Sequence, residues 1–241
     1  MNTTLSCDAP SSQPLSPRDR AQLYHFLELA FAHPGEDGHA YFSEESTERD
    51  FQGRYKGVGQ AGGILDQKGE TAASQFFAGI RRMSFEDAEA AHISLFTNNY
   101  PHLPCPPYGS LFTTVDSDKR LAEMLAIKEF YQSHGVDMSE TFDDLPDHLC
   151  VELEFLQLLC FREGEAVDRS DAELLAGVRD AQAEFLDRFL LKFTDCLADI
   201  AIKLVPENPY SHLLDSMRYL VHVHRSQLDA ANQSAIPGSP S

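Results

Sequence analysis

Residues 142–156 read FDDLPDHLCVELEFL, a stretch that decides the fold because a strongly apolar helix begins within it. Asp143 or Asp144 ends a loop, and Pro146 suits the first helical turn, where its missing N–H removes no hydrogen bond. Asp147 then lies where the helix dipole favours negative charge. The apolar side of the helix comprises Leu149, Val151, Leu153, Phe155, Leu156, Leu158, Leu159 and Cys160. Because apolar residues cover so much of its circumference, this helix is predicted to be central and heavily buried.

Helical signals of the same kind fill most of the remaining chain. Ser16 and Pro17 form a helix-opening pair, and Ser84 with Asp87 forms a capping signature for another helix. The expected helices cover approximately 17–33, 70–83, 84–96, 117–134, 146–163, 170–193, 194–205 and 209–229. Alternating apolar and polar stretches of the strand type are almost absent. The predicted fold class is therefore all-α, a single globular helical bundle.

Three segments lack this regular pattern. Residues 1–15 and the tail 230–241 are rich in Ser, Pro and Gly or Thr, and both are predicted to be disordered. Residues 35–69 are polar and glycine-rich, which predicts one short helix and a loop. The predicted organisation is one all-helical domain over 16–229 between the two disordered ends. The proline-rich loop at 101–107 is either a seam between two helical groups or a long surface loop.

The charge balance is strongly acidic. Lys and Arg total 19 against 38 Asp and Glu, which gives a formal net charge of −19. Such a surface repels phosphate backbones and anionic lipids, so nucleic acids and membrane surfaces are poor partners. A basic peptide would be attracted to it. The alternative is that the acidity only keeps the protein soluble.

Cysteine usage and the N-terminal sequence favour the cytoplasm. The chain has five cysteines, an odd number, and none is arranged as CxxC. This argues against a disulfide framework or a zinc knuckle and favours a reducing compartment. The first 17 residues have neither a basic region nor an apolar core, so no secretory signal is expected. No apolar run approaches the ~18 residues of a membrane span.

Short motifs for cofactor, metal or nucleophile chemistry are weak. Residues 57–62 read GVGQAG, but no apolar strand precedes them, so a mobile glycine loop is expected instead of a dinucleotide site. His222 and His224, and His148 with Glu152, have spacings that a metal could use, although neither pair has further ligands nearby in sequence. Cys150 has no activating partner beyond His148. No metal and no cofactor are expected.

At LPDHL, residues 145–149, followed by ELEFL, the chain resembles the TorD/DmsD/NarJ family of cytoplasmic all-α chaperones for molybdenum-cofactor oxidoreductases. The family pattern is Glu/Asp-x-Pro-x-Asp-His. A second shared motif is Leu-Phe followed by Pro-Pro-aromatic-x-Ser. The second motif is matched by Leu95, Phe96, Pro106, Pro107, Tyr108 and Ser110. The first is matched in chemistry by Asp144, Pro146, Asp147 and His148, although the spacing differs because Pro146 directly precedes Asp147. Relatives often have Trp where Tyr108 stands, and this chain has no Trp.

The resemblance implies a non-enzymatic chaperone. It would bind the twin-arginine-type leader and the apo form of a molybdenum-cofactor oxidoreductase, and assist cofactor insertion and assembly before export. An exposed Arg–carboxylate pair contributes only about 0.2–1 kcal/mol. Burying on the order of 500 Å² of apolar surface contributes roughly 12 kcal/mol gross. Apolar groove residues would therefore supply the affinity, and acids the orientation.

The expected peptide-binding residues combine both kinds of group. They are Asp144, Pro146, Asp147, His148, Phe96, Pro106, Pro107, Tyr108, Ser110 and Leu111. Titration of His148 near neutrality is a further hypothesis for tuning release. Two alternatives stay open, a stable accessory subunit of the oxidoreductase and a small enzyme that uses Asp147 and His148 as an acid/base dyad. Monomer and homodimer are both compatible with the sequence.

Overall fold

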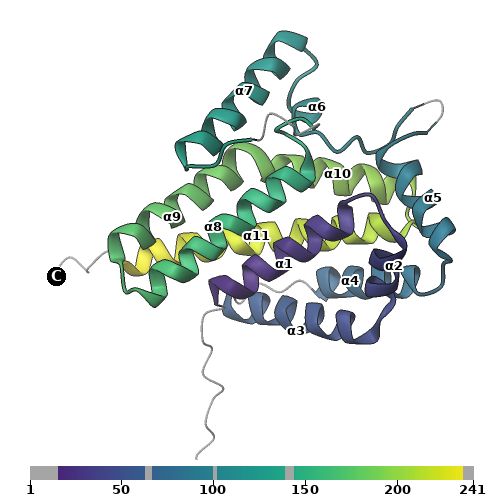
Figure 1. The fold of residues 1–241 in the computed structure, drawn as a ribbon, viewed down its shortest axis with the longest axis horizontal. Coiled ribbons are helices and arrows are strands. Elements are labelled where there is room, and N and C mark those ends of the chain that lie inside the picture. The colour runs from purple at the N-terminus through teal and green to yellow at the C-terminus, as the bar shows by residue number, and fades with distance from the viewer. Residues whose placement is uncertain (1–15, 63–66, 100–101, 139–143, 236–241) are drawn as a thin grey trace, which may run out of the picture.

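The computed structural model describes residues 16–62, 67–99, 102–138 and 144–235. Within these ranges the chain is a bundle of helices without a β-strand, so the predicted all-α class is confirmed (Figure 1). The helices are α1 (Pro17–Phe31), α2 (Glu36–Ser43), α3 (Glu45–Gly62), α4 (Gln67–Ile80), α5 (Phe85–Phe96), α6 (Ser110–Thr113), α7 (Ser117–Ser133), α8 (Leu149–Asp168), α9 (Ala172–Phe185), the π-helical turn η1 (Leu186–Leu190), α10 (Leu191–Leu204) and α11 (Pro209–Ala235).

The predicted caps define two helix starts correctly. The Ser16 side chain accepts a hydrogen bond from the backbone N–H of Arg18, with Pro17 in the first turn of α1. Ser84 accepts from the N–H of Asp87 at the start of α5. These side chains satisfy backbone donors that the first turn of a helix leaves free.

Several predicted boundaries differ from the structure. Residues 35–69 contain two helices, and GVGQAG at 57–62 forms the last turns of α3. Tertiary packing outweighs the low helix propensity of glycine here, because Phe51 and Tyr55 of α3 are buried in the core. No break occurs near residue 193, since η1 joins α9 directly to α10.

The C-terminal helix runs past its predicted end. Helix α11 continues to Ala235, past the predicted end of the domain at residue 229. The predicted disordered segment 1–15 and the last residues of the tail, 236–241, lie outside the described residues.

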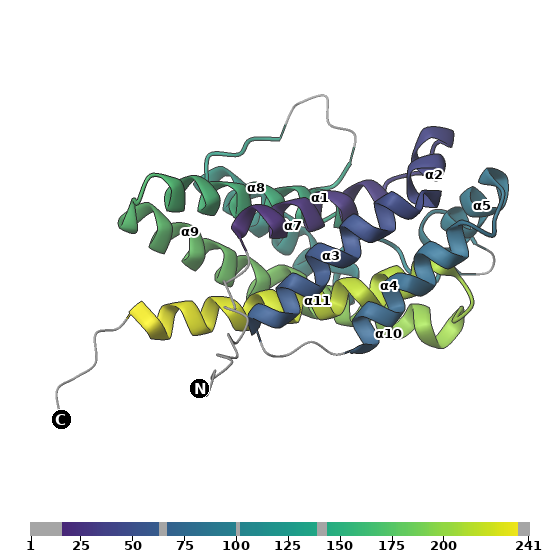
Figure 2. The same ribbon diagram turned by 90° about the horizontal axis from the view of Figure 1, so that it is seen from below.

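Two long helices organise the core. Helix α8 packs along α1, and α11 packs against α3, α4 and α10 on the opposite side (Figure 2). The predicted central helix is therefore correct, because Leu149, Leu153 and Leu156 of α8 are fully buried. Among the described residues, no helix is both long and apolar enough to cross a membrane.

A buried ionic network joins α1, α8 and α9. Glu163 accepts hydrogen bonds from the guanidinium groups of Arg20 and Arg179 and from the Gln182 amide. Burial alone would raise the pKa of Glu163, but the neighbouring Arg20 and the three hydrogen bonds hold it below the usual value. The network fixes the relative positions of the helices that carry the candidate site.

Helix α7 stands apart from the bundle (Figure 1). Its C-terminal half is attached through aromatic side chains, with the rings of Tyr131 and Phe155 4.6 Å apart and those of Phe130 and Phe185 5.7 Å apart. Leu121 and Leu125 in its N-terminal half are exposed. The large rings act as spacers, so a space remains open between the end of α7 and α8.

Candidate functional site

The structure brings together two motif segments that are far apart in the sequence. The loop before α6 runs beside the start of α8, where Gly109 N–H donates to the Asp147 carbonyl at 2.9 Å and Leu149 N–H donates to the Pro107 carbonyl at 2.8 Å. Tyr108 and His148 form an isolated antiparallel bridge between these bonds. The fold thus places the Pro-Pro motif against the Asp-His motif.

Asp147 faces inward and holds this loop. Its side chain is 3% exposed, and its Oδ2 accepts a hydrogen bond from the Ser110 N–H at 2.9 Å. Its Oδ1 has no hydrogen-bond partner among the described residues. In this conformation the carboxylate stabilises the start of α6, and it does not face solvent, where a peptide cation would lie.

Glu152, one turn further along α8, is an unusual buried acid. It is 1% exposed, and burial, reinforced by the nearby Asp147 carboxylate, raises its pKa well above the usual value. A Cβ at Gly109 would lie only 3.0 Å from Glu152 Oε1, so glycine permits the close approach of the loop. Glu152 and Asp147 therefore form a buried acidic pair beneath the motif loop.

His148, Tyr108 and Asp144 form the outward side of the motif. The rings of Tyr108 and His148 lie 5.2 Å apart, and His148 Nε2 lies 3.7 Å from Asp144 Oδ2. Burial lowers the pKa of His148, against the opposite effect of Asp144 and Asp147. Burial and the Asp144 carboxylate raise the pKa of Tyr108. These three are the accessible polar groups of the predicted site.

The geometry does not support an acid/base dyad of Asp147 and His148. His148 is the N-cap of α8, and its Nδ1 accepts from the Cys150 N–H at 3.2 Å. The proton of the neutral ring is then on Nε2, which faces Asp144 and not Asp147. Helix α8 consequently begins at Leu149, three residues later than predicted, because the histidine side chain caps it.

The candidate metal ligands His222 and His224 make other contacts. His222 Nε2 lies 2.9 Å from Asp195 on the surface, whereas His224 is buried and its Nδ1 lies 2.9 Å from the Tyr24 hydroxyl. Within the described parts of the chain, no group of three or more His, Cys, Asp or Glu residues could hold a metal ion. Burial raises the thiol pKa of Cys150 to about 12, so it is a poor nucleophile.

The remaining predicted peptide-binding residues lie in different surroundings. Phe96 is buried in the core, with its ring 5.9 Å from that of Phe31 and 6.0 Å from that of Tyr210. Pro107 is buried and Pro106 half-buried in the motif loop, and Leu111 is exposed on α6. Pro146 is half-buried, and its carbonyl accepts from the Tyr131 hydroxyl at 2.9 Å.

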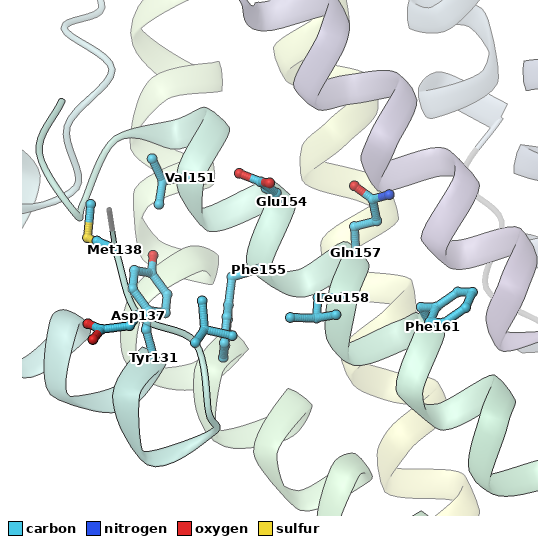
Figure 3. Close-up of a pocket in the computed structure, with 10 residues that line it drawn as sticks. Tyr131, Asp137, Met138, Val151, Glu154, Phe155, Gln157, Leu158 and Phe161 are labelled. Atoms are coloured by element: carbon cyan, nitrogen blue, oxygen red, sulfur yellow. The ribbon is translucent and has the colours of Figure 1, made fainter. Parts of the chain in front are cut away.

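An apolar hollow of about 410 Å³ lies beside the motif, between the end of α7 and the outer face of α8 (Figure 3). We call it the α7–α8 hollow. Its apolar wall consists of Tyr131, Val136, Met138, Val151, Phe155, Leu158 and Phe161. Tyr131 links it to the motif through the bond to Pro146, and Val151 lies one turn after His148.

Acids surround this hollow. Asp137 and Glu154 belong to its lining and are exposed. Glu28 of α1 lies nearby, and burial, with a contribution from Glu154, raises its pKa although His25 acts in the opposite direction. The arrangement of apolar floor and acidic rim suits a segment that is both apolar and basic.

Sequence reasoning missed this hollow, although a signal for it was present. The apolar surface of α8 includes Val151, Leu158 and Phe161. It is wider than the neighbouring helices α1 and α9 can cover. The segment Val136–Met138 carries apolar residues just after the glycine that ends α7. Neither observation alone placed the two segments on opposite walls of one cavity.

Comparison with known proteins identifies the family. The family model described as nitrate reductase delta subunit matches residues 65–199, which is more than half of the chain. The chain belongs to this family. The match confirms the predicted relationship with the TorD/DmsD/NarJ group.

Similar proteins of this group include chaperones named for particular reductases. The selenate reductase assembly chaperone protein of Thauera selenatis is 37% identical over 113 residues, 46% of this chain and 54% of that protein. The perchlorate reductase assembly chaperone protein of Dechloromonas aromatica (strain RCB) is 24% identical over 87% of this chain and 89% of that protein. The matched part thus spans about half the length of the first relative and most of the second.

One solved structure covers nearly the whole chain. It is a candidate redox enzyme maturation protein from Archaeoglobus fulgidus, 21% identical, covering 92% of this chain and 99% of that chain with a TM-score of 0.44.

Proposed function

We propose that this chain is a non-enzymatic cytoplasmic chaperone for a reductase that carries a molybdenum cofactor. It binds the N-terminal leader and the apo form of the catalytic subunit, and it assists cofactor insertion and assembly before export. The family match and the names of the relatives support a role in reductase assembly. The observation that carries the leader-binding part is the acid-rimmed apolar α7–α8 hollow beside the Asp-His motif.

The leader, in this proposal, lays its apolar segment into the α7–α8 hollow. Each apolar side chain that is fully buried contributes about 1.5–3 kcal/mol, whereas each exposed ion pair contributes about 0.2–1 kcal/mol. Val151, Leu158 and Phe161 would therefore supply most of the affinity. Their partly exposed positions leave them available to a partner.

The basic pair of the leader would meet the acids at the rim. Asp137 and Glu154 are accessible there, Asp144 lies in the neighbouring motif beside His148, and the overall charge of −19 attracts a basic peptide from a distance. Arginine pairs with a carboxylate in bidentate geometry, which lysine does not reproduce. These acids would set orientation, association rate and preference for arginine.

The buried motif residues would act by support. Asp147, Ser110, Pro107 and Pro146 hold the loop and the start of α8 in place, and Tyr108 with His148 forms the accessible edge. Phe96 belongs to the core that carries them. Variants of the supporting residues should lower stability before they change peptide affinity.

Capture from cytoplasm followed by mass spectrometry identifies the client. Titration of the purified chain with a synthetic probe then tests the binding mode. The probe, called the RR peptide below, carries an Arg-Arg pair followed by a leucine-rich apolar segment, and its control carries Lys-Lys. We expect saturable binding of the RR peptide and weaker binding of the control. Equal binding of a peptide with a polar segment would contradict the proposal.

A second candidate function has one observation in its favour. The matching family model is described as a subunit, which suits a protein that stays bound to the finished enzyme. Co-purification separates the two functions. A chaperone is found with apo-enzyme and is absent from the cofactor-loaded enzyme, whereas an accessory subunit is present in both.

A further inference from the structure

A second apolar hollow lies at the corner where α1 passes into α2. Its volume is about 360 Å³, and we call it the α1–α2 hollow. Its wall includes Leu29 of α1, Gly38, His39 and Tyr41 of α2, Ile80 of α4 and Tyr210 of α11. The hollow reaches from the surface down to the core, because Ile80 and Tyr210 are buried.

The fold covers several groups at this hollow only in part. Leu29 and Tyr41 remain 44% and 46% exposed, although both are large apolar side chains on its wall. The Nε2 atom of His39 is buried and has no hydrogen-bond partner among the described residues. A bound segment could cover the two exposed apolar side chains.

The surroundings of the hollow select a basic ligand. Asp37 belongs to the wall and Glu36 precedes it in the first turn of α2. Glu89 of α5 pairs with His33 of the wall at 3.1 Å. No Lys or Arg belongs to the wall. Apolar walls with acids around them repeat the chemistry of the α7–α8 hollow.

The two hollows lie near each other on one face. The Cys150 thiol at the start of α8 donates to the carbonyl of Glu28 at 3.7 Å, so the turn of α1 that bears Leu29 lies beside the turn of α8 that bears Val151. Helices α8, α1 and α2 follow one another on the front of the molecule in Figure 1 and along the upper edge in Figure 2. A peptide leaving the α7–α8 hollow therefore meets Leu29 after crossing the acids Glu154 and Glu28.

We propose that the α1–α2 hollow is a second subsite for the basic leader and takes one of its apolar side chains. This inference rests on the proposed function, and it adds that the leader crosses α1 instead of ending at α8.

Filling the hollow tests the inference. Gly38 lines the hollow and a Cβ there meets nothing within 4 Å, so Gly38→Leu adds an apolar side chain at this wall. Gly53 in α3 is exposed, also has open space, and lines neither hollow, so Gly53→Leu is the matched control for the gain in helix propensity. We expect Gly38→Leu to weaken RR-peptide binding about 10-fold to 100-fold, the loss of one buried apolar side chain, and Gly53→Leu to leave it unchanged.

A second pair of variants tests the same subsite independently of Gly38→Leu. Leu29→Ser should weaken binding several-fold, whereas Leu204→Ser, at an exposed leucine of α10, should not. The double variant Gly38→Leu with Leu29→Ser should lose no more RR-peptide affinity than the weaker-binding of the two single variants, because both changes disable the same subsite. Equal affinities of Gly38→Leu and Gly53→Leu for the RR peptide overturn the inference. Effects of either variant on self-association or on capture of the folded client do not change this conclusion. Failure of the unaltered chain to bind the RR peptide overturns the proposed function itself.

Discussion

Replacing Glu152 by glutamine should stabilise the protein at neutral pH. Glu152 is 1% exposed, its pKa is raised well above 4.5, and no ion pair with it occurs among the described residues. Between the unfolded pKa and the raised folded pKa, the folded state keeps a proton that the unfolded state has lost. Stability from this group is therefore present at low pH and is lost as pH rises.

The magnitude follows from the number of protons involved. One proton changes the free energy of unfolding by at most about 1.4 kcal/mol per pH unit. Glutamine does not titrate, so the stability difference between Glu152→Gln and the unaltered chain should grow with pH by up to that amount. Between pH 5 and pH 7 the gain should reach up to about 3 kcal/mol. Titrating groups that do not interact with Glu152 are common to both proteins and cancel in the difference.

Urea unfolding followed by circular dichroism at pH 5, 6, 7 and 8 measures this difference. Glu129→Gln on the exposed side of α7 is the control and should show no pH-dependent gain. RR-peptide affinity should stay unchanged, because Glu152 does not line the α7–α8 hollow. A Glu152→Gln variant that is less stable at pH 7, or a difference that is constant with pH, would refute the reasoning.

Three further outcomes follow from buried polar groups. Glu163→Gln leaves two arginines without their carboxylate and should cost about 3–5 kcal/mol in urea unfolding, whereas Glu165→Gln in an exposed pair should cost less than about 1 kcal/mol. Asp147→Ala frees the buried N–H of Ser110 and should cost about 1–3 kcal/mol, with Asp147→Asn closer to the unaltered chain; equal losses would contradict the loop-holding role. Burial lowers the pKa of His224 well below 6.5, so on acidification the unfolded state takes up a proton before the folded state does. The free energy of unfolding should therefore fall as the pH drops below about 6.5. A His224→Gln variant whose unfolding free energy falls with the same slope would contradict this assignment.

The fold was predictable from the sequence because helix signals are local. Caps such as Ser16 and Ser84 and the apolar face of α8 act within a few residues, and the structure agrees with them. GVGQAG at 57–62 misled the prediction, since glycine propensity is weaker than the packing of α3 on the core.

The candidate site was predictable only in part. The motifs drew attention to the loop before Ser110 and to the start of α8, and the structure places these two segments side by side. They did not show that Asp147 turns inward, because the orientation of a side chain next to a helix start depends on which backbone N–H lies nearby. The α7–α8 hollow depends on how far the rings of Phe130 and Tyr131 hold α7 from the bundle, a tertiary property that no local pattern encodes.

The most direct test of the central claim is the affinity of the RR peptide for Leu158→Asp, measured by isothermal titration calorimetry. Leu158 lines the α7–α8 hollow, and the exposed Leu204 of α10 offers the same substitution far from it. We expect Leu158→Asp to weaken binding about 10-fold or more, since an apolar contact is lost and a charge would be desolvated. Leu204→Asp should bind like the unaltered chain. Equal affinity of the two variants would contradict leader binding in the hollow.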